Sequence, residues 1–252
     1  MTKNMKAIHF IYIISLLAGL SSCDGGDIAE KFYTVDEKGH TVELTAQVSG
    51  ISEWDGTGYA LALAGFTANN QFARVQRALP GTIRVGTPIS ITLSNLSDDI
   101  EMVELALTNS LRKRIITLAT IDMNDYRSYG TRDTIRLDLG TINLGRIGVL
   151  QTGLFDRACI QCHGANGHSA AGLTLTDGNA CAALVNVPST CSEGYKRVES
   201  GDAEASLLHI ILSEGGEDLL SYNHTEILSS HFKTNLEEVS SLIDWWISHL
   251  KP

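Results

Sequence analysis

The hydrophobic pattern of the chain changes near residue 145, and this change constrains its fold more than any other feature. From about residue 41 to 142, apolar residues such as Val42 and Leu44 alternate with polar ones. About seven short runs of this kind, separated by turn residues, are typical of an antiparallel β-sandwich. Between the first and last runs, the others lie near residues 59–66, 72–79, 89–96, 102–108 and 114–121. We therefore predict an all-β, immunoglobulin-like antiparallel sandwich over residues 41–144.

Beyond this point the apolar residues recur at helical intervals. Thr234 and Asn235 are candidate N-caps, each followed after three residues by a glutamate, and the next apolar residues fall on one helical face. This spacing predicts an amphipathic helix at the C-terminus. A shorter helical pattern leads up to Cys159. These segments predict a second domain, made of helices, over residues 145–252.

One segment, Cys159-Ile160-Gln161-Cys162-His163, specifies a chemistry. Cys-x-x-Cys-His is the attachment signature of c-type haem, in which two nearby thiols add to the two vinyl groups of one porphyrin. The adjacent His163 can then give a ring nitrogen to the iron as an axial ligand. A redox dithiol or half of a zinc site is the alternative, but neither requires the adjacent histidine. The motif occurs once, so we expect one covalently attached haem c.

The N-terminus predicts export. A basic start and a mostly apolar run lead into Leu20-Ser21-Ser22-Cys23, and the run is too short to span a bilayer. Small residues before a cysteine resemble the bacterial lipobox, so we predict a signal peptide over residues 1–22, lipidation of Cys23 and an anchor linker over residues 23–40. A plain signal peptide with an incidental cysteine is the alternative. The protein is then expected to be exported and lipid-anchored to a bacterial membrane, on the periplasmic side or at the cell surface.

The C-terminal part of the chain resembles the class I cytochrome c domain, in the variant found in exported proteins of planctomycetes and Bacteroidota. The resemblance rests on residues 159–164, on Ala-Ala-Gly-Leu-Thr-Leu at residues 170–175 and on the Arg-Val-x-x-Gly-Asp stretch within residues 197–208. Where that family has prolines, this chain has Ser200 and Ala203. The resemblance implies an all-α class I cytochrome c fold for the helical domain.

The resemblance also implies a sixth iron ligand, which this chain would supply differently. The family uses a methionine, but the four methionines of this chain all precede the haem motif. The equivalent loop contains His224, which is our candidate for the sixth ligand, and His231 is the alternative closer to the C-terminal helix. An iron without any protein ligand in the sixth position is the third possibility.

Two cysteines remain after lipid and haem are assigned. Cys181 and Cys191 are separated by a short segment of an exported chain. Cysteines in an oxidising compartment usually pair, so we predict a disulfide between them, with two free thiols as the alternative.

The charge of the chain restricts its partners. The formal net charge is −10, and residues 151–252 contain 13 Asp and Glu residues against 5 Lys and Arg residues. This acidity argues against nucleic acid as a partner. It favours a redox partner protein with a basic docking face, although a solvated acidic surface explains the same charge.

Together these features predict a membrane-anchored, mono-haem c-type cytochrome that carries single electrons outside the cytoplasm. Two histidine ligands would close the iron to substrates, so we expect no enzymatic activity. The alternative is a ligand-binding or haem-based sensing surface lipoprotein, in which the β-sandwich binds a surface ligand. The two hypotheses differ in whether the sixth position of the iron is filled.

Overall fold

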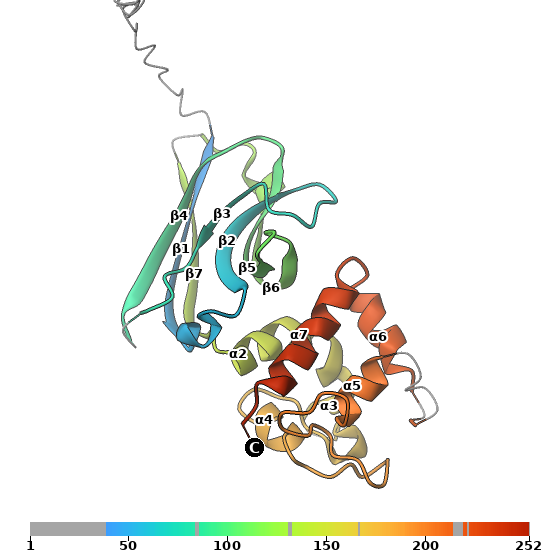
Figure 1. Ribbon diagram of the computed structural model, residues 1–252. Helices are drawn as coiled ribbons and strands as arrows, with labels where there is room; N and C mark the ends of the chain where they lie inside the picture. The colour runs from blue at the N-terminus through green and yellow to red at the C-terminus, as the bar shows by residue number, and fades with distance from the viewer. Residues whose placement is uncertain are drawn as a thin grey trace, which may run out of the picture. The chain divides into compact units, whose positions relative to one another are not determined.

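A computed structural model of the chain describes residues 39–83, 86–130, 133–165, 167–213, 219–220 and 222–251 (Figure 1). The predicted signal peptide, the predicted lipidation site Cys23 and all but the end of the predicted linker lie outside the described residues. The described residues all belong to one compact unit.

Seven strands pair into two sheets. They are β1 (His40–Ser49), β2 (Tyr59–Thr67), β3 (Val75–Ala78), β4 (Pro88–Leu96), β5 (Ile100–Asn109), β6 (Arg114–Asp122) and β7 (Thr134–Asn143). One sheet has the order β4-β1-β7 and the other the order β3-β2-β5-β6. β1 pairs antiparallel with β4 but parallel with β7, where Val42 lies opposite Ile135. The pairs of the four-stranded sheet are all antiparallel, with Leu63 opposite Leu105.

The helical segments are short, and most follow β7. Two of them, η1 (Ile51–Trp54) and η2 (Met123–Tyr126), lie among the strands. The others are α2 (Arg146–Leu150), η3 (Gln151–Cys159), α3 (Ile160–His163), η4 (Ala170–Gly172), α4 (Ala180–Leu184), α5 (Leu207–Leu212), α6 (His224–His231) and α7 (Leu236–Ser248).

The burial of each strand follows from its place in the sheets. β1 buries alternate residues, because one of its faces lies on the core and the other faces solvent. β2 and β5, the central strands of the four-stranded sheet, bury consecutive residues on both faces. On β5, Glu104 is only 3% exposed, and its carboxylate accepts hydrogen bonds from Arg114 (2.5 Å) and Thr117 (2.8 Å). The carboxylate is tolerated in this position because it is paired and hydrogen-bonded.

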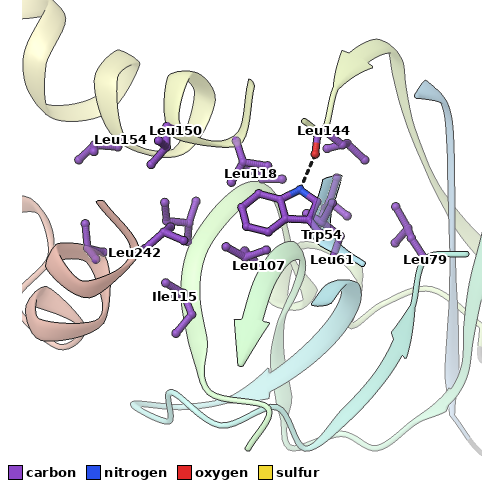
Figure 2. Close-up of a cluster of buried hydrophobic side chains, with 14 of the residues drawn as sticks. Trp54, Leu61, Leu79, Leu107, Ile115, Leu118, Leu144, Leu150, Leu154 and Leu242 are labelled. Atoms are coloured by element: carbon purple, nitrogen blue, oxygen red, sulfur yellow. Dashed lines mark hydrogen bonds between the residues drawn. The ribbon is translucent and has the colours of Figure 1, made fainter. Parts of the chain in front are cut away.

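One hydrophobic cluster runs from the sheets into the helices (Figure 2). It includes Trp54 from η1, Leu107 from β5 and Leu150 from α2. The Trp54 indole nitrogen donates to the carbonyl of Leu144 at 2.7 Å, and its ring stacks on Trp245 of α7 with the centroids 5.7 Å apart. Burial of each large apolar side chain contributes about 1.5–3 kcal/mol, so the strands and helices stabilise each other through this shared core.

A glycine permits the close approach of η3 to β6. A Cβ atom at Gly153 would lie 2.0 Å from Cγ2 of Ile116, a side chain that is fully buried. Any larger residue at position 153 would have to displace either the helix or Ile116. The sequence therefore places the segment that precedes Cys159 directly against the four-stranded sheet.

The predicted fold class is wrong. The chain is not an all-β antiparallel sandwich followed by an all-α class I cytochrome c fold, because the structure is mostly sheet, in sheets of three and four strands, with about 30% helix. β7 adds to β1 in parallel, and a period-two pattern carries no information on strand direction. After β7 the helices are short, and they share their core with the sheets instead of forming a separate all-α bundle.

The predicted domain limits stay a prediction. The limit between residues 144 and 145 falls in the turn between β7 and α2. Within the part of the chain that the structure describes, no helix has the length and apolar character needed to cross a membrane.

Candidate cofactor site

The Cys-x-x-Cys-His motif lies at the end of a continuous helical run. α2 leads directly into η3, which is π-helical and ends at Cys159, and α3 follows with Cys162 and His163 in its last turn. A π-helical turn is wider than an α-helical one and frequently occurs at functional sites. The run is fixed against the sheets by its buried face, so the motif is presented from a supported element.

The two thiols of the motif differ in exposure. Cys159 is half-buried and Cys162 is exposed. Burial, together with the charges of Asp156 and Cys162, raises the pKa of Cys159 to about 12. A thiolate is the nucleophile in thiol–disulfide exchange, so a protonated Cys159 would not be the attacking thiol of a redox pair. A thioether, by contrast, is neutral and places no charge in this half-buried position.

The loop after the motif returns to His163 and fixes its ring. The backbone nitrogen of Leu175 donates to the carbonyl of His163 at 2.7 Å, and the buried Gln151 amide donates to the Leu175 carbonyl at 2.8 Å. Nδ1 of His163 lies 3.1 Å from the carbonyl oxygen of Ala170. A carbonyl oxygen can only accept a hydrogen bond, so Nδ1 carries the proton and Nε2 keeps its lone pair.

The surroundings of His163 favour its neutral form. Burial lowers the pKa of His163 from its ordinary value of 6.5, and the neighbouring His224 contributes to this lowering. Metal ions bind the neutral imidazole. The site therefore holds His163 in the protonation state that a metal ligand requires.

His224 lines the same pocket as His163 and is the first residue of α6. Its Nδ1 donates to the carbonyl of Tyr222 at 3.0 Å, which again leaves Nε2 with a lone pair. Asn223 caps the helix by accepting a hydrogen bond from the backbone nitrogen of Glu226 at 2.8 Å. The Thr225 hydroxyl lies 3.3 Å from a carbonyl oxygen of α5. These contacts fix the helix end that carries His224.

The rings of His163 and His224 lie close together. Their centroids are 6.2 Å apart and their planes differ by 21°. An ion bound by both Nε2 atoms from opposite sides, at about 2.0–2.1 Å, would place the centroids roughly 6.3 Å apart, so the centroid distance is compatible with a shared ion. A hydrogen bond from the other ring nitrogen to a backbone carbonyl, which both histidines make, is the usual partner of a metal-bound histidine.

The pocket between the rings is small and mostly apolar. Its walls are Ala171, Leu173, Leu184, Ser189, Thr190, Cys191, Arg197, Leu207, Leu208, Ile211 and Leu220, besides the two histidines. Arg197 is the one cation among these lining residues. The volume of this open pocket is about 70 Å³, which is smaller than a porphyrin, so haem binding would require the pocket to widen.

The other histidines are placed differently. His231 ends α6, is exposed, and does not belong to the lining of this pocket as described. About 10 Å of helix separates it from His224. His209 is bonded through Nδ1 to the Asp244 carboxylate at 2.7 Å. The structure therefore brings His224, and not His231, to the motif histidine.

The motif could also belong to a zinc site, which usually takes four protein ligands. Among the described residues, no group of three or more His, Cys, Asp and Glu side chains could hold a metal ion. Haem iron takes four ligands from the porphyrin and needs at most two from the protein. His163 and His224 are the two side chains that could supply them.

The remaining two cysteines are not joined in this structure. Cys181 lies in α4 and Cys191 in the loop that lines the pocket, and both are free and exposed. Their predicted disulfide stays a prediction.

Several features of the site were not predicted from the sequence. They are the carbonyls of Ala170 and Tyr222, which orient the histidines, and the hydroxyl of Thr190, which bonds the carbonyl of Ala171. Backbone carbonyls have no sequence signature. The one local signal is Gly172, whose φ of 61° allows the tight turn that follows Ala171.

Comparisons with protein-family models, with curated proteins and with solved structures give no match for this chain.

Proposed function

We propose that this protein carries one c-type haem and transfers single electrons outside the cytoplasm, anchored to a membrane by a lipid on Cys23. The observation that carries the proposal is the pair of His163 and His224. Their rings lie 6.2 Å apart next to a Cys-x-x-Cys-His motif, and each has Nδ1 bound to a backbone carbonyl. Two neighbouring imidazoles with Nδ1 bound to carbonyl oxygens support axial ligation of a haem iron, which takes at most two ligands from the protein.

Each residue of the site has a distinct role in this proposal. Cys159 and Cys162 would hold the porphyrin by thioether bonds, and His163 and His224 would bind its iron. Haem held in this way supplies a one-electron couple between ferric and ferrous iron. The leucines of the pocket would pack against the porphyrin, and Arg197 would add a positive charge that offsets the carboxylates of a haem.

The ligand pair favours electron transfer over other haem functions. Two protein ligands leave no position on the iron for a substrate, so outer-sphere electron transfer is the remaining activity. Imidazole in place of methionine lowers the reduction potential, because it stabilises ferric iron. The acidic balance of residues 151–252 supports a redox partner with a basic docking face.

The direct test is to mature the full chain in a bacterium that assembles c-type cytochromes. We expect haem to stay on the polypeptide in a denaturing gel, and the purified protein to be low-spin in both oxidation states. His224→Ala should convert the iron to high spin and open it to carbon monoxide. His231→Ala, the matched control on the same helix, should leave the spectrum unchanged.

Two results would change the proposal. A colourless polypeptide after maturation would exclude the haem protein altogether. If wild-type ferrous protein binds carbon monoxide readily, the sixth position is open, and the haem-based sensing lipoprotein becomes the better hypothesis.

A further inference from the structure

The turn that supports His163 contains a strained residue. Ala171 has φ 55° and ψ 24°, a left-handed conformation that costs a residue with a Cβ atom about 1–2 kcal/mol. Such conformations persist where the surrounding contacts over-determine them, and they gather at ligand sites.

Two side chains from a distant loop hold this residue. The carbonyl oxygen of Ala171 accepts one hydrogen bond from the Thr190 hydroxyl at 2.8 Å and another from Nη2 of Arg197 at 2.9 Å. Nη1 of the same guanidinium donates to the carbonyl of Ala183 at 2.9 Å, so the arginine is itself anchored to α4. Two donors on one carbonyl oxygen oppose the strain of the left-handed residue.

The conformation of Ala171 determines what His163 can bond to. The preceding carbonyl, that of Ala170, accepts the hydrogen bond from Nδ1 of His163 at 3.1 Å. If Ala171 relaxed to a right-handed or extended conformation, the Ala170 carbonyl would turn with the peptide that joins the two residues. The ring of His163 would then lose its hydrogen bond to Ala170.

We propose that Thr190 and Arg197 are positioning residues for His163, which set the donor strength of its Nε2 by fixing Ala171 and thereby the Ala170 carbonyl. This inference rests on the proposed function, because it takes His163 as an iron ligand. An imidazole that donates a hydrogen bond from Nδ1 is a stronger base at Nε2 and stabilises ferric iron. Loosening the two bonds to Ala171 therefore raises the reduction potential.

The test is the midpoint potential of the haem-loaded full chain with Thr190→Val, which removes the hydroxyl and keeps the shape of the side chain. Changes in the second partner of a metal-bound histidine alter metal affinity about 10–100-fold. We expect a shift of about tenfold in the balance of ferric and ferrous iron, which is an increase of about 59 mV for one electron.

Three further variants separate positioning from general stability. Thr190→Ser keeps the hydroxyl and should retain the wild-type potential. Ala171→Gly combined with Thr190→Val should restore it in part, because glycine adopts the left-handed conformation without strain. Thr176→Val removes a threonine hydroxyl that bonds Asn179 in the turn before α4, and it should leave the potential unchanged.

The failures of the two proposals are distinguishable. If wild-type protein matures without haem, the proposed function fails. If haem attaches but Thr190→Val has the wild-type potential, or if Thr176→Val shifts it equally, the positioning role is wrong and the proposed function stands.

Discussion

Residues 40–143 and residues 146–251 hold their backbone in different ways. In the first region all strands but β3 have nine or ten residues and pair through regular ladders. In the second region α3, α4 and α5 have only four to six residues. The loops between them are held partly by individual side chains, among them Arg197 and Ser206.

Because of this difference, the first region can act as a scaffold, whereas the second region carries the candidate site. A ladder distributes stability over many equivalent hydrogen bonds, so no single side chain decides it. A loop that is fixed by one arginine or one hydroxyl depends on that residue and on whatever fills the pocket beside it. The residues of the proposed haem site, Cys159 to His163 and His224, all lie in the second region.

The largest expected effect comes from removing haem attachment. Cys159→Ala with Cys162→Ala should abolish covalent haem completely. A ligand that binds the folded state at a hundred to a thousand times its dissociation constant stabilises it by about 3–4 kcal/mol, so amide hydrogen exchange should accelerate in residues 164–175 and 189–197. Exchange in β2 and β5 should stay slow. If amide exchange accelerates equally in both regions, the stability of the β region also depends on the haem. The proposed difference between the two regions would then be wrong.

The next effect concerns the contact between the two regions. Gly153→Ala should destabilise the fold by about 1–3 kcal/mol. The cost of overpacking a filled core is larger than the stability gained by replacing a glycine within a helix. The measurement is the free energy of unfolding from chemical denaturation.

Ile116→Ala provides the matched control, because it removes the Cγ2 atom that a Cβ at position 153 would meet. In the double variant the two costs should be less than additive. If the two losses in free energy of unfolding are additive, the Cβ at position 153 does not clash with Ile116, and η3 has shifted away from β6.

A smaller effect is expected where α7 meets the sheet. β6 is an edge strand, and Nδ2 of Asn235 donates to the carbonyl of Ile115 on it at 2.6 Å. Asn235→Ala leaves this carbonyl without its partner and should cost about 1–2 kcal/mol in the free energy of unfolding. Asn179→Ala, which removes an amide bonded only within an exposed turn, should cost less. The reverse order would show that the Asn235 contact adds no stability.

Asn235 shows how much of this fold the sequence predicts. The spacing of Asn235 and its following glutamates predicts the start of α7 correctly, and the helix runs from Leu236 to Ser248. Period-two runs likewise predict where the strands lie. The assembly was predicted wrongly, because neither pattern reveals that Asn235 binds β6 instead of capping α7, or that β7 adds to β1 in parallel.

The sequence predicts which residues could form the site, but not how they are arranged in space. The motif from Cys159 to His163 is local, and the lack of a later methionine leaves His224 as a candidate ligand. The approach of His224 to His163 is a contact between residues far apart in sequence, which depends on how α6 packs. The left-handed Ala171 and the carbonyl of Ala170 belong to the backbone, and no side-chain pattern encodes them.

The smallest effect is a pH dependence confined to the second region, and it is measured on the haem-free Cys159→Ala/Cys162→Ala protein. Burial lowers the pKa of His163 below its ordinary value of 6.5, and His224 adds to the effect. Below pH 6.5 the unfolded chain therefore binds a proton that the folded chain does not. Stability is then present above pH 6.5 and is lost as the pH falls towards the lowered pKa of the folded state.

His163→Asn removes this titrating group. It should therefore reduce the slope of the free energy of unfolding against pH below pH 6.5. His168→Asn, a change at an exposed histidine of the same loop, should keep the slope of the parent. If His163→Asn keeps that slope too, the ring of His163 is as solvated as an unfolded one. The second region would then lack the desolvated imidazole that distinguishes its pocket from an ordinary surface loop.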